Sequence, residues 1–407
     1  MTHNLIRSII FVALLSVING CISEVENNVP DLDNLIVVAE RQSGLQSISL
    51  IKELEFASSE SELIAKAGQF DVDDIGRVYI GDAMQHRVHV FGSNGHYQAY
   101  FGREGSGPGE FRAMGSLTYS DGYLYVYDPL MMRLSAFLTD TFEESNTIYI
   151  QAINKREIEE LSGLIQNGFM FIGPNTFLVN FNSRLVPNPD YDGYNLNDTY
   201  RTYHLMDRNR RLELNRVFKK PDYRALSATV GGKYRFTQFE FLGSTLLAAS
   251  ENSIYMARSG KFLIKVYNTE SSYQRAYYYP YQKQRFTREE AIRQQIADYE
   301  EGVFEWRVSV IEHAPEGQIP DTWPALNDLI VDDENRLWVS TIVENFDVYE
   351  WWILEESGEL ITTFEWPRNE PIEVIKNGKM YTRQTDEETG LQQVVRYRVE
   401  MEKATCL

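Results

Sequence analysis

Cysteine is nearly missing from this chain. Only Cys21 and Cys406 occur among its 407 residues, too few for the disulfide network that holds small secreted domains together. The sequence alone does not decide whether these two cysteines form a disulfide with each other. Aromatic residues are plentiful instead, with 25 Tyr, 21 Phe and 6 Trp. This composition favours β-strands with broad packing faces.

Basic residues are scarce relative to acidic ones. The chain has 39 Lys and Arg against 59 Asp and Glu, which gives a formal net charge of -20 at pH 7. A surface of this sign repels phosphates, so nucleic acid is excluded as a partner. The length would fit two average domains, but all-β folds often reach this size as one domain.

The N-terminus lacks a hydrophobic run long enough for a membrane span. Its apolar stretch covers residues 8–18, whereas a spanning helix needs about 20 residues. The stretch follows Arg7 and has the length of a signal-peptide core. The sequence Ile18-Asn19-Gly20-Cys21 then resembles the lipobox of bacterial lipoproteins, in which the cysteine is acylated, for example with palmitate. A simple secretory signal with a chance cysteine is the alternative.

The lipobox resemblance sets the predicted organisation of the N-terminus. Residues 1–20 are predicted to be a lipoprotein signal peptide, Cys21 the lipidated residue, and residues 21–44 a flexible tether. The protein is then expected in the cell envelope, anchored by lipid on the extracytoplasmic side. Because Ile22 rather than an aspartate follows the cysteine, the resemblance favours the outer membrane if the bacterium has two membranes.

The segment from Phe70 to Phe111 carries the clearest structural pattern. Four β-rich runs alternate here with turns of Asp, Asn and Gly, which predicts one four-stranded antiparallel blade. Runs that resemble its second strand recur at 77–80, 123–127, 176–179, 245–248, 336–339 and 379–382. Six units of about four strands predict a six-bladed β-propeller over residues 45–400, followed by a tail at 401–407.

Two details of this propeller follow from the spacing. The sixth unit lacks a fourth strand, and the strand-like segment 47–56 would supply it and close the ring. In the fourth unit, 238–242 is taken as the first strand and 245–248 as the second.

A helix is predicted at 284–302, inserted between blades four and five, with Thr287 as its N-cap.

Unit one also resembles a known repeat. The pattern from Gly76 to Phe111, GRVYIGD followed by HRVHVF and FGREGSGPGEF, looks like an NHL-type repeat. It is similar to the six-bladed β-propeller lipoproteins of Bacteroidetes-like bacteria, and the segment Asp332 to Val339 resembles a fifth-blade pattern of that group. The resemblance implies a structural role for Asp82, which shapes the turn after the second strand, and for Arg87, which crosses back to it. It implies the fold and the export route but no single activity.

Candidate ligand-binding residues lie where blades connect and where the pattern is interrupted. The glycine-rich stretch 102–110 lacks the Lys-Ser/Thr ending of a phosphate loop and leads into no helix, so it is interpreted as a crossing between blades. Such crossings line one mouth of the central channel, and the insertion 284–323 is the most specialised surface. The predicted ligand-binding residues are Arg103, Glu104, Glu110, Arg112, Trp306, Trp323 and Asn327.

No catalytic or metal-binding residue is assigned. A metal-dependent lactonase or lyase would need Asp, Glu, Asn or His side chains that converge from first strands of different blades, and the first strands are mostly apolar or aromatic. No cofactor is predicted, although a structural divalent cation stays open. The leading hypothesis is a monomeric binding or protein-interaction module for a protein, peptide or carbohydrate. The alternatives are a metal-dependent enzyme of the lactonase or lyase kind and an envelope scaffold without a small ligand.

Overall fold

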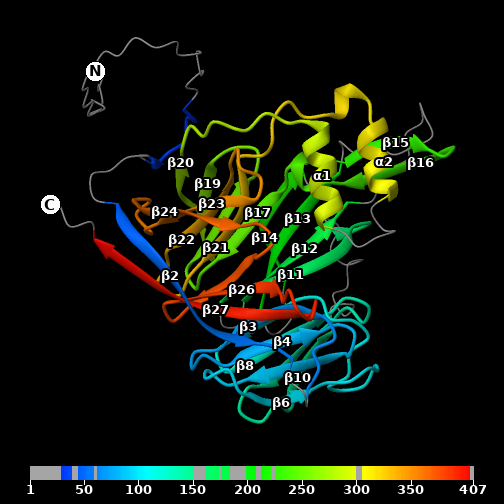
Figure 1. The fold of residues 1–407 in the computed structure, drawn as a ribbon, viewed down its shortest axis with the longest axis vertical. Coiled ribbons are helices and arrows are strands. Elements are labelled where there is room, and N and C mark those ends of the chain that lie inside the picture. Colours follow the sequence, from blue (N-terminus) through cyan, green and yellow to red (C-terminus); the bar gives the residue numbers. More distant parts are fainter. Residues whose placement is uncertain are drawn as a thin grey trace.

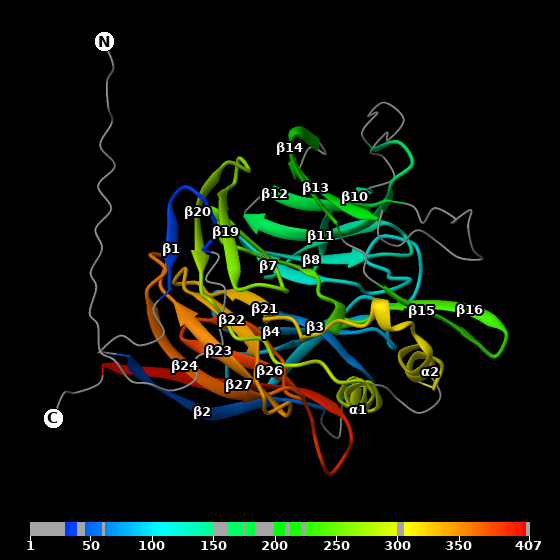
Figure 2. The same cartoon turned by 90° about the horizontal axis from the view of Figure 1, so that it is seen from above.

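The computed structural model describes residues 29–38, 45–58, 62–149, 161–173, 176–183, 199–207, 212–221, 225–298 and 305–403. The predicted signal peptide, Cys21 and Cys406 lie outside these ranges. The described residues form seven sheets, of which six, antiparallel apart from the pairing of one short strand, are the blades of a β-propeller (Figure 1, Figure 2), and this confirms the predicted fold. No helix among them is both long and apolar enough to span a bilayer.

Five blades are built from consecutive strands, the first of each lying nearest the central axis. Innermost strands of neighbouring blades lie beside one another, as β3 does with β7 and β25, and β21 with β17 and β25. The strands are β3 (Ala67–Val72), β4 (Val78–Asp82), β5 (Arg87–Phe91) and β6 (Tyr97–Phe101) in blade one; β7 (Leu117–Ser120), β8 (Tyr123–Asp128), β9 (Arg133–Leu138) and β10 (Glu144–Tyr149) in blade two; β11 (Ile165–Gly173), β12 (Thr176–Asn182), β13 (Tyr200–Asp207) and β14 (Leu212–Pro221) in blade three; β17 (Thr245–Ala249), β18 (Ser253–Arg258), β19 (Leu263–Asn268) and β20 (Tyr273–Tyr278) in blade four; and β21 (Leu326–Val331), β22 (Leu337–Ile342), β23 (Val348–Leu354) and β24 (Leu360–Pro367) in blade five.

Blade six combines the two ends of the chain, as predicted. Strands β25 (Ile372–Lys376), β26 (Lys379–Thr385) and β27 (Gln392–Lys403) are completed by β2 (Gln46–Phe56), which pairs antiparallel with β27 from Gln46↔Lys403 to Phe56↔Val394. The blue strand β2 and the red strand β27 run side by side in Figure 1. Closure of the ring in this way leaves no open edge between first and last blade.

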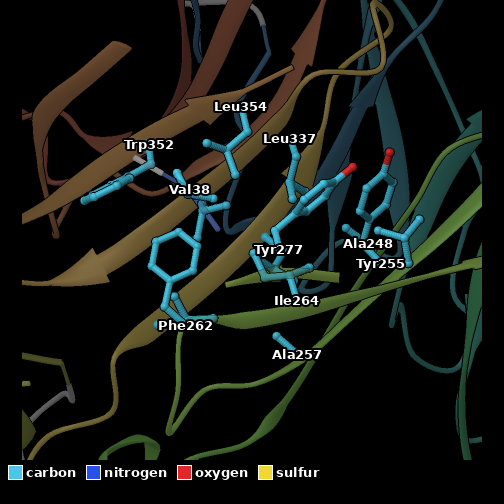
Figure 3. Close-up of a cluster of buried hydrophobic side chains, with 14 of the residues drawn as sticks. Val38, Ala248, Tyr255, Ala257, Phe262, Ile264, Tyr277, Leu337, Trp352 and Leu354 are labelled. Carbon is cyan, nitrogen blue, oxygen red and sulfur yellow. The ribbon is translucent and has the colours of Figure 1, made fainter. Parts of the chain in front are cut away.

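Part of the predicted flexible tether is a strand. Segment β1 (Leu35–Val37) pairs in parallel with β20 and gives blade four a fifth strand. Val38 follows it and is 3% exposed, lying among Phe262, Tyr277 and Trp352 in the core between blades four and five (Figure 3). Burial of this apolar residue outweighs the polar character of the neighbouring sequence, so residues 29–38 belong to the folded body.

Blade four differs from the prediction in its first two strands. The run 245–248 lies in the innermost strand β17, and the second strand is β18. The segment predicted as the first strand contains the end of a preceding hairpin and a 3-10 turn at Glu240–Leu242. A turn followed by a short apolar run marks a strand but does not say which position the strand takes in its blade, and this explains the error.

Two insertions pack together on one side of the propeller. The first is the hairpin β15 (Ala225–Val230) and β16 (Lys233–Gln238), turned at Gly231 and Gly232, where φ is 59° and 74°. The second holds the predicted helix as α1 (Arg288–Asp298), and a further helix, α2 (Glu305–His313). Figure 1 shows α2 beside the hairpin, and these elements share one apolar cluster that includes Leu226 and Val310.

The N-cap of α1 forms as predicted, whereas α2 has no comparable sequence signal. Thr287 Oγ1 accepts a hydrogen bond from Glu290 N at 3.3 Å. Helix α2 is short for an isolated helix and contains the β-branched residues Val308 and Val310. Its stability comes from packing on the hairpin and from Arg288, whose guanidinium donates to carbonyl oxygens at the C-terminal end of α2, including that of Ile311.

Candidate functional site

A cavity of about 1120 Å³ lies between the two insertions and the ends of blades four, five and six. Its floor is formed where innermost strands begin, by Ser244 before β17, by Leu326, Asn327 and Asp328 on β21, and by Pro371 before β25. These starts lie on the face where outer strands cross to the next blade. The cavity therefore opens at the predicted mouth of the propeller.

The two insertions supply one side of the cavity. Helix α1 contributes Arg293, Gln294 and Gln295, α2 contributes Arg307, and the end of the hairpin contributes Gln238 with Phe239 and Phe241 beyond it. The opposite side comes from the β22–β23 loop with Phe346 and Asp347, from Tyr349, and from the crossing into blade six with Arg368 and Asn369. Segments about 130 residues apart in the chain thus meet around one space.

Arg307 fixes the position of the insertions against each other. Its Nε donates to Gln295 Oε1 at 3.0 Å, its Nη1 to Thr237 Oγ1 at 2.9 Å, and its Nη2 to the carbonyl oxygen of Gln238 at 3.1 Å. The guanidinium also lies 4.8 Å from the ring centroid of Phe239. One residue thus joins α2 to α1 and to the hairpin, because a guanidinium offers several donors in a rigid plane.

Asp328 is the acid on the floor of the cavity. Its Oδ1 accepts a hydrogen bond from Leu329 N at 2.8 Å. Burial raises the pKa of this carboxyl group to about 6, against the opposing effect of that hydrogen bond. The group therefore changes between a neutral donor and a charged acceptor at mildly acidic pH.

Two further inner-strand carboxyl groups share this behaviour. Burial raises the pKa of Asp71 on β3 and of Glu373 on β25 to about 6. Asp71 accepts from Tyr119 N of the next blade at 2.7 Å, and Glu373 pairs with Arg383 at 2.6 Å. Each carboxyl group thus has its own protein partner. Across the described ranges, no three His, Cys, Asp or Glu side chains are grouped so that they could hold a metal ion.

The predicted ligand-binding residues fall into two groups. Trp323 and Asn327 line the cavity. Trp306 lies beside it on α2, with the guanidinium of Arg235 over its ring at 5.7 Å. The other four, Arg103, Glu104, Glu110 and Arg112, belong to the crossing from blade one to blade two and do not line the cavity.

That glycine-rich crossing is held by contacts of its own. Arg133, 1% exposed, donates to the carbonyl oxygens of Ser106 and Gly107 at 3.1 and 3.0 Å, and also to that of Glu110. Arg103 Nη2 pairs with Glu110 Oε1 at 2.7 Å, and Arg112 N donates to Asp128 Oδ2 at 2.7 Å. The polar groups of the crossing are therefore largely used to shape it.

Asp82 and Arg87 have structural contacts, although one differs from the expectation. Asp82 is fully buried and accepts from Met84 N and Gln85 N in the turn after β4, at 2.9 and 3.0 Å, as predicted. It also accepts from Ala65 N in the segment that leads into the blade. Arg87 does not pair with it: its guanidinium lies 4.2 Å from the ring centroid of Tyr100 on β6, so a cation–π contact replaces the expected ion pair.

Several cavity residues escaped the sequence analysis. Gln238, Gln295, Arg307, Arg368 and Asn369 carry no motif, and tertiary packing alone brings them together. One local signal was present: Gly231-Gly232 between two β-rich runs is typical of a hairpin turn. It marks the insertion that forms one side of the cavity.

Comparison with known proteins agrees with this architecture. A family model for DUF5128, described as a 6-bladed beta-propeller, matches residues 23–160. No curated protein shows significant sequence similarity. Among solved structures, a member of the DUF4221 family from Bacteroides vulgatus aligns with a TM-score of 0.50 at 11% identity, over 88% of this chain and 99% of that one.

Two further solved structures align less closely. A protein from Bacteroides fragilis, provisionally described as exported, gives a TM-score of 0.45 at 11% identity, over 90% of this chain and 99% of that one. Virginiamycin B lyase from Staphylococcus aureus gives 0.38 at 8% identity, over 86% and 88%. Likeness at these identities concerns the fold alone. By its fold the chain is a six-bladed β-propeller, similar over its first third to the family model of that description.

Proposed function

We propose that this protein is a binding module of the cell envelope whose ligand occupies the cavity between the insertions and blades four to six. The observation that carries the proposal is the cavity itself. It is large, it lies at the mouth of the propeller, and one side of it is built by segments that are not part of any blade. Elaborations of this kind on a rigid scaffold commonly hold binding sites.

A bulky residue at the rim of the cavity should abolish ligand binding. Asn369 is exposed and lines the cavity, so the indole of Asn369→Trp can enter the space without disturbing the core. We would screen oligosaccharides, peptides and small organic molecules by thermal shift. Ligand at one hundred times Kd adds about 2.7 kcal/mol to stability, so a bound compound raises Tm for the native protein, and this rise should vanish in Asn369→Trp.

The matched control is Asn146→Trp, which places the same side chain on the exposed outer strand of blade two. It should keep the ligand-induced rise in Tm. A rise that persists unchanged in Asn369→Trp would show that the ligand binds elsewhere, and the cavity would no longer be the proposed site.

Location in the envelope is the second part of the proposal. It is supported by the charged and apolar segments of the N-terminus and by the sequence Ile18-Asn19-Gly20-Cys21, which resembles a lipobox. Two or three acyl chains on this cysteine would bind a membrane firmly, whereas a single chain binds only marginally. The first strand of the folded body, β1, begins at Leu35, so the anchor and the propeller are close in sequence.

Replacement of the predicted lipidated cysteine should release the protein from membranes. In Cys21→Ala, fractionation of cells is expected to move the protein from the membrane pellet to the soluble extracytoplasmic fraction. Metabolic labelling with a fatty-acid analogue should label the native protein and should not label Cys21→Ala. Retention of Cys21→Ala in the membrane pellet, with the native protein unlabelled, would contradict the lipid anchor.

A further inference from the structure

Three of the amide side chains that line the cavity have no protein partner among the described residues. Gln238, Asn327 and Asn369 line it, and their side chains make no hydrogen bond to any described residue. An amide offers a donor and an acceptor a short distance apart. These amides can be reached from the cavity, so the set is suited to a ligand or to water that both donates and accepts.

Gln295 adds a donor whose orientation is fixed. Its side chain is 6% exposed, and its Oε1 accepts the hydrogen bond from Arg307 Nε. Since a guanidinium can only donate, the amide oxygen must face Arg307. The Nε2 amino group has no acceptor among the described residues, and Gln295 lines the cavity. The site thus contains a nearly buried donor held in one orientation by the protein.

The charged side chains of the cavity do not favour an anionic ligand. Arg307 uses Nε and both Nη groups within the protein. Arg293 pairs with Glu290 at 2.9 Å, and Arg368 donates to Val348 O while lying 4.3 Å from the ring centroid of Tyr349. Arg307 and Arg293 therefore offer no open guanidinium fork to a phosphate or sulfate, and Asp328 places an acidic group on the floor.

The shape of the cavity also disfavours a peptide. An extended peptide is usually bound along a continuous strand edge, and a helical one in an apolar groove. Here the lining comes from short separate segments, and the rings of Phe239, Phe241 and Trp323 are 2%, 4% and 3% exposed. The accessible lining combines polar atoms with a slightly larger share of apolar ones. The volume of the cavity, about 1120 Å³, slightly exceeds the usual range of about 300–1,000 Å³ for small-molecule pockets.

From these observations we infer that the cavity binds a neutral oligosaccharide. Each sugar hydroxyl both donates and accepts, which matches the amides of Gln238, Asn327 and Asn369, the fixed amino group of Gln295 and the carboxyl group of Asp328. The volume of about 1120 Å³ accommodates several sugar rings. This inference rests on the proposed binding function and names the class of its ligand.

The inference can be tested with arrays of immobilised oligosaccharides and peptides. The oligosaccharide set should contain neutral, uronate-containing and sulfated members. Native protein is expected to bind neutral oligosaccharides, and Asn327→Ala to bind them at least tenfold more weakly, since the substitution removes one amide contact. Asn327 makes no hydrogen bond within the described protein, so the variant should fold normally. The control is Asn146→Ala on the outer strand of blade two, which should bind like the native protein.

The possible outcomes separate this inference from the proposed function. Neutral oligosaccharides bound by the native protein and lost in Asn327→Ala support both. Binding that depends on Asn327 but is confined to peptides, or to uronate-containing or sulfated oligosaccharides, overturns the ligand class and leaves the binding function in place. Absence of any binding that responds to Asn327→Ala or Asn369→Trp, across both arrays and the thermal-shift screen, overturns both.

Discussion

Arg133→Ala is expected to lower the free energy of unfolding by about 3–5 kcal/mol, because several carbonyl oxygens lose their donor at a cost of about 1–3 kcal/mol each. Arg133 is 1% exposed and donates to the carbonyl oxygens of Ser106, Gly107 and Glu110. Alanine would leave these carbonyls without their donor and would open a space where the largest part of the side chain is packed. The glycine-rich crossing would then lose the contact that fixes it to β9.

Urea unfolding followed by tryptophan fluorescence would measure this effect. Arg103→Ala is the matched control, because Arg103 contacts the same crossing through Glu110 but has a side chain that is 77% exposed. Exposed pairs contribute about 0–1 kcal/mol, so this variant should unfold near the native midpoint. If both variants unfolded at the same urea concentration, the crossing would not depend on Arg133. If Arg133→Ala could not be purified folded, Arg133→Lys would retain the charge and should show an intermediate loss.

The sequence reveals blade one and the closure of the ring because both depend on local signals. Turn residues such as Gly76 and Gly95 adopt φ values of 82° and 84°, which glycine reaches without steric cost, and the strands between them are short and regular. Closure follows from counting, since the sixth unit lacks a strand and the N-terminus offers one. Neither inference requires knowledge of how distant side chains pack.

The cavity could be predicted only in part, because its walls depend on contacts between distant segments. Trp323 and Asn327 could be predicted from the sequence because they lie near the insertion and the start of a first strand. Arg307 acquires its role only when α2 packs on the hairpin, which ends at Gln238. No local pattern encodes a contact between residues 238 and 307. The prediction for the first two strands of blade four was wrong for a related reason, since position within a sheet is set by pairing partners rather than by the strand itself.

Blades one and five share a buried turn. Asp332 Oδ1 accepts from Glu334 N and Arg336 N at 3.0 and 2.8 Å, and its Oδ2 accepts from Arg336 Nε and Trp338 Nε1 at 2.7 and 2.9 Å. In blade one, Asp73 makes the same set of contacts with Ile75 N, Arg77 and the hydroxyl group of Tyr79. The first two strands of blades one and five are thus joined by the same three residues. These are an acid, an arginine four positions after it, and an aromatic donor two positions after the arginine.

Asp332→Ala should therefore destabilise the protein by about 3–5 kcal/mol, as expected when one partner of a buried ion pair is removed. Asp332 is 4% exposed and Trp338 is fully buried, so the variant leaves the indole N–H of Trp338 and the Nε of Arg336 without their acceptor. Asp332→Asn keeps a neutral acceptor and should lose less stability.

Glu334→Ala is the control, because Glu334 also pairs with Arg336, at 3.0 Å, but its side chain is 58% exposed. The urea concentration at the unfolding midpoint should be highest for Glu334→Ala, lower for Asp332→Asn and lowest for Asp332→Ala. Equal midpoints for Glu334→Ala and Asp332→Ala would mean that the turn is held by its backbone alone and that the buried acid does not stabilise it.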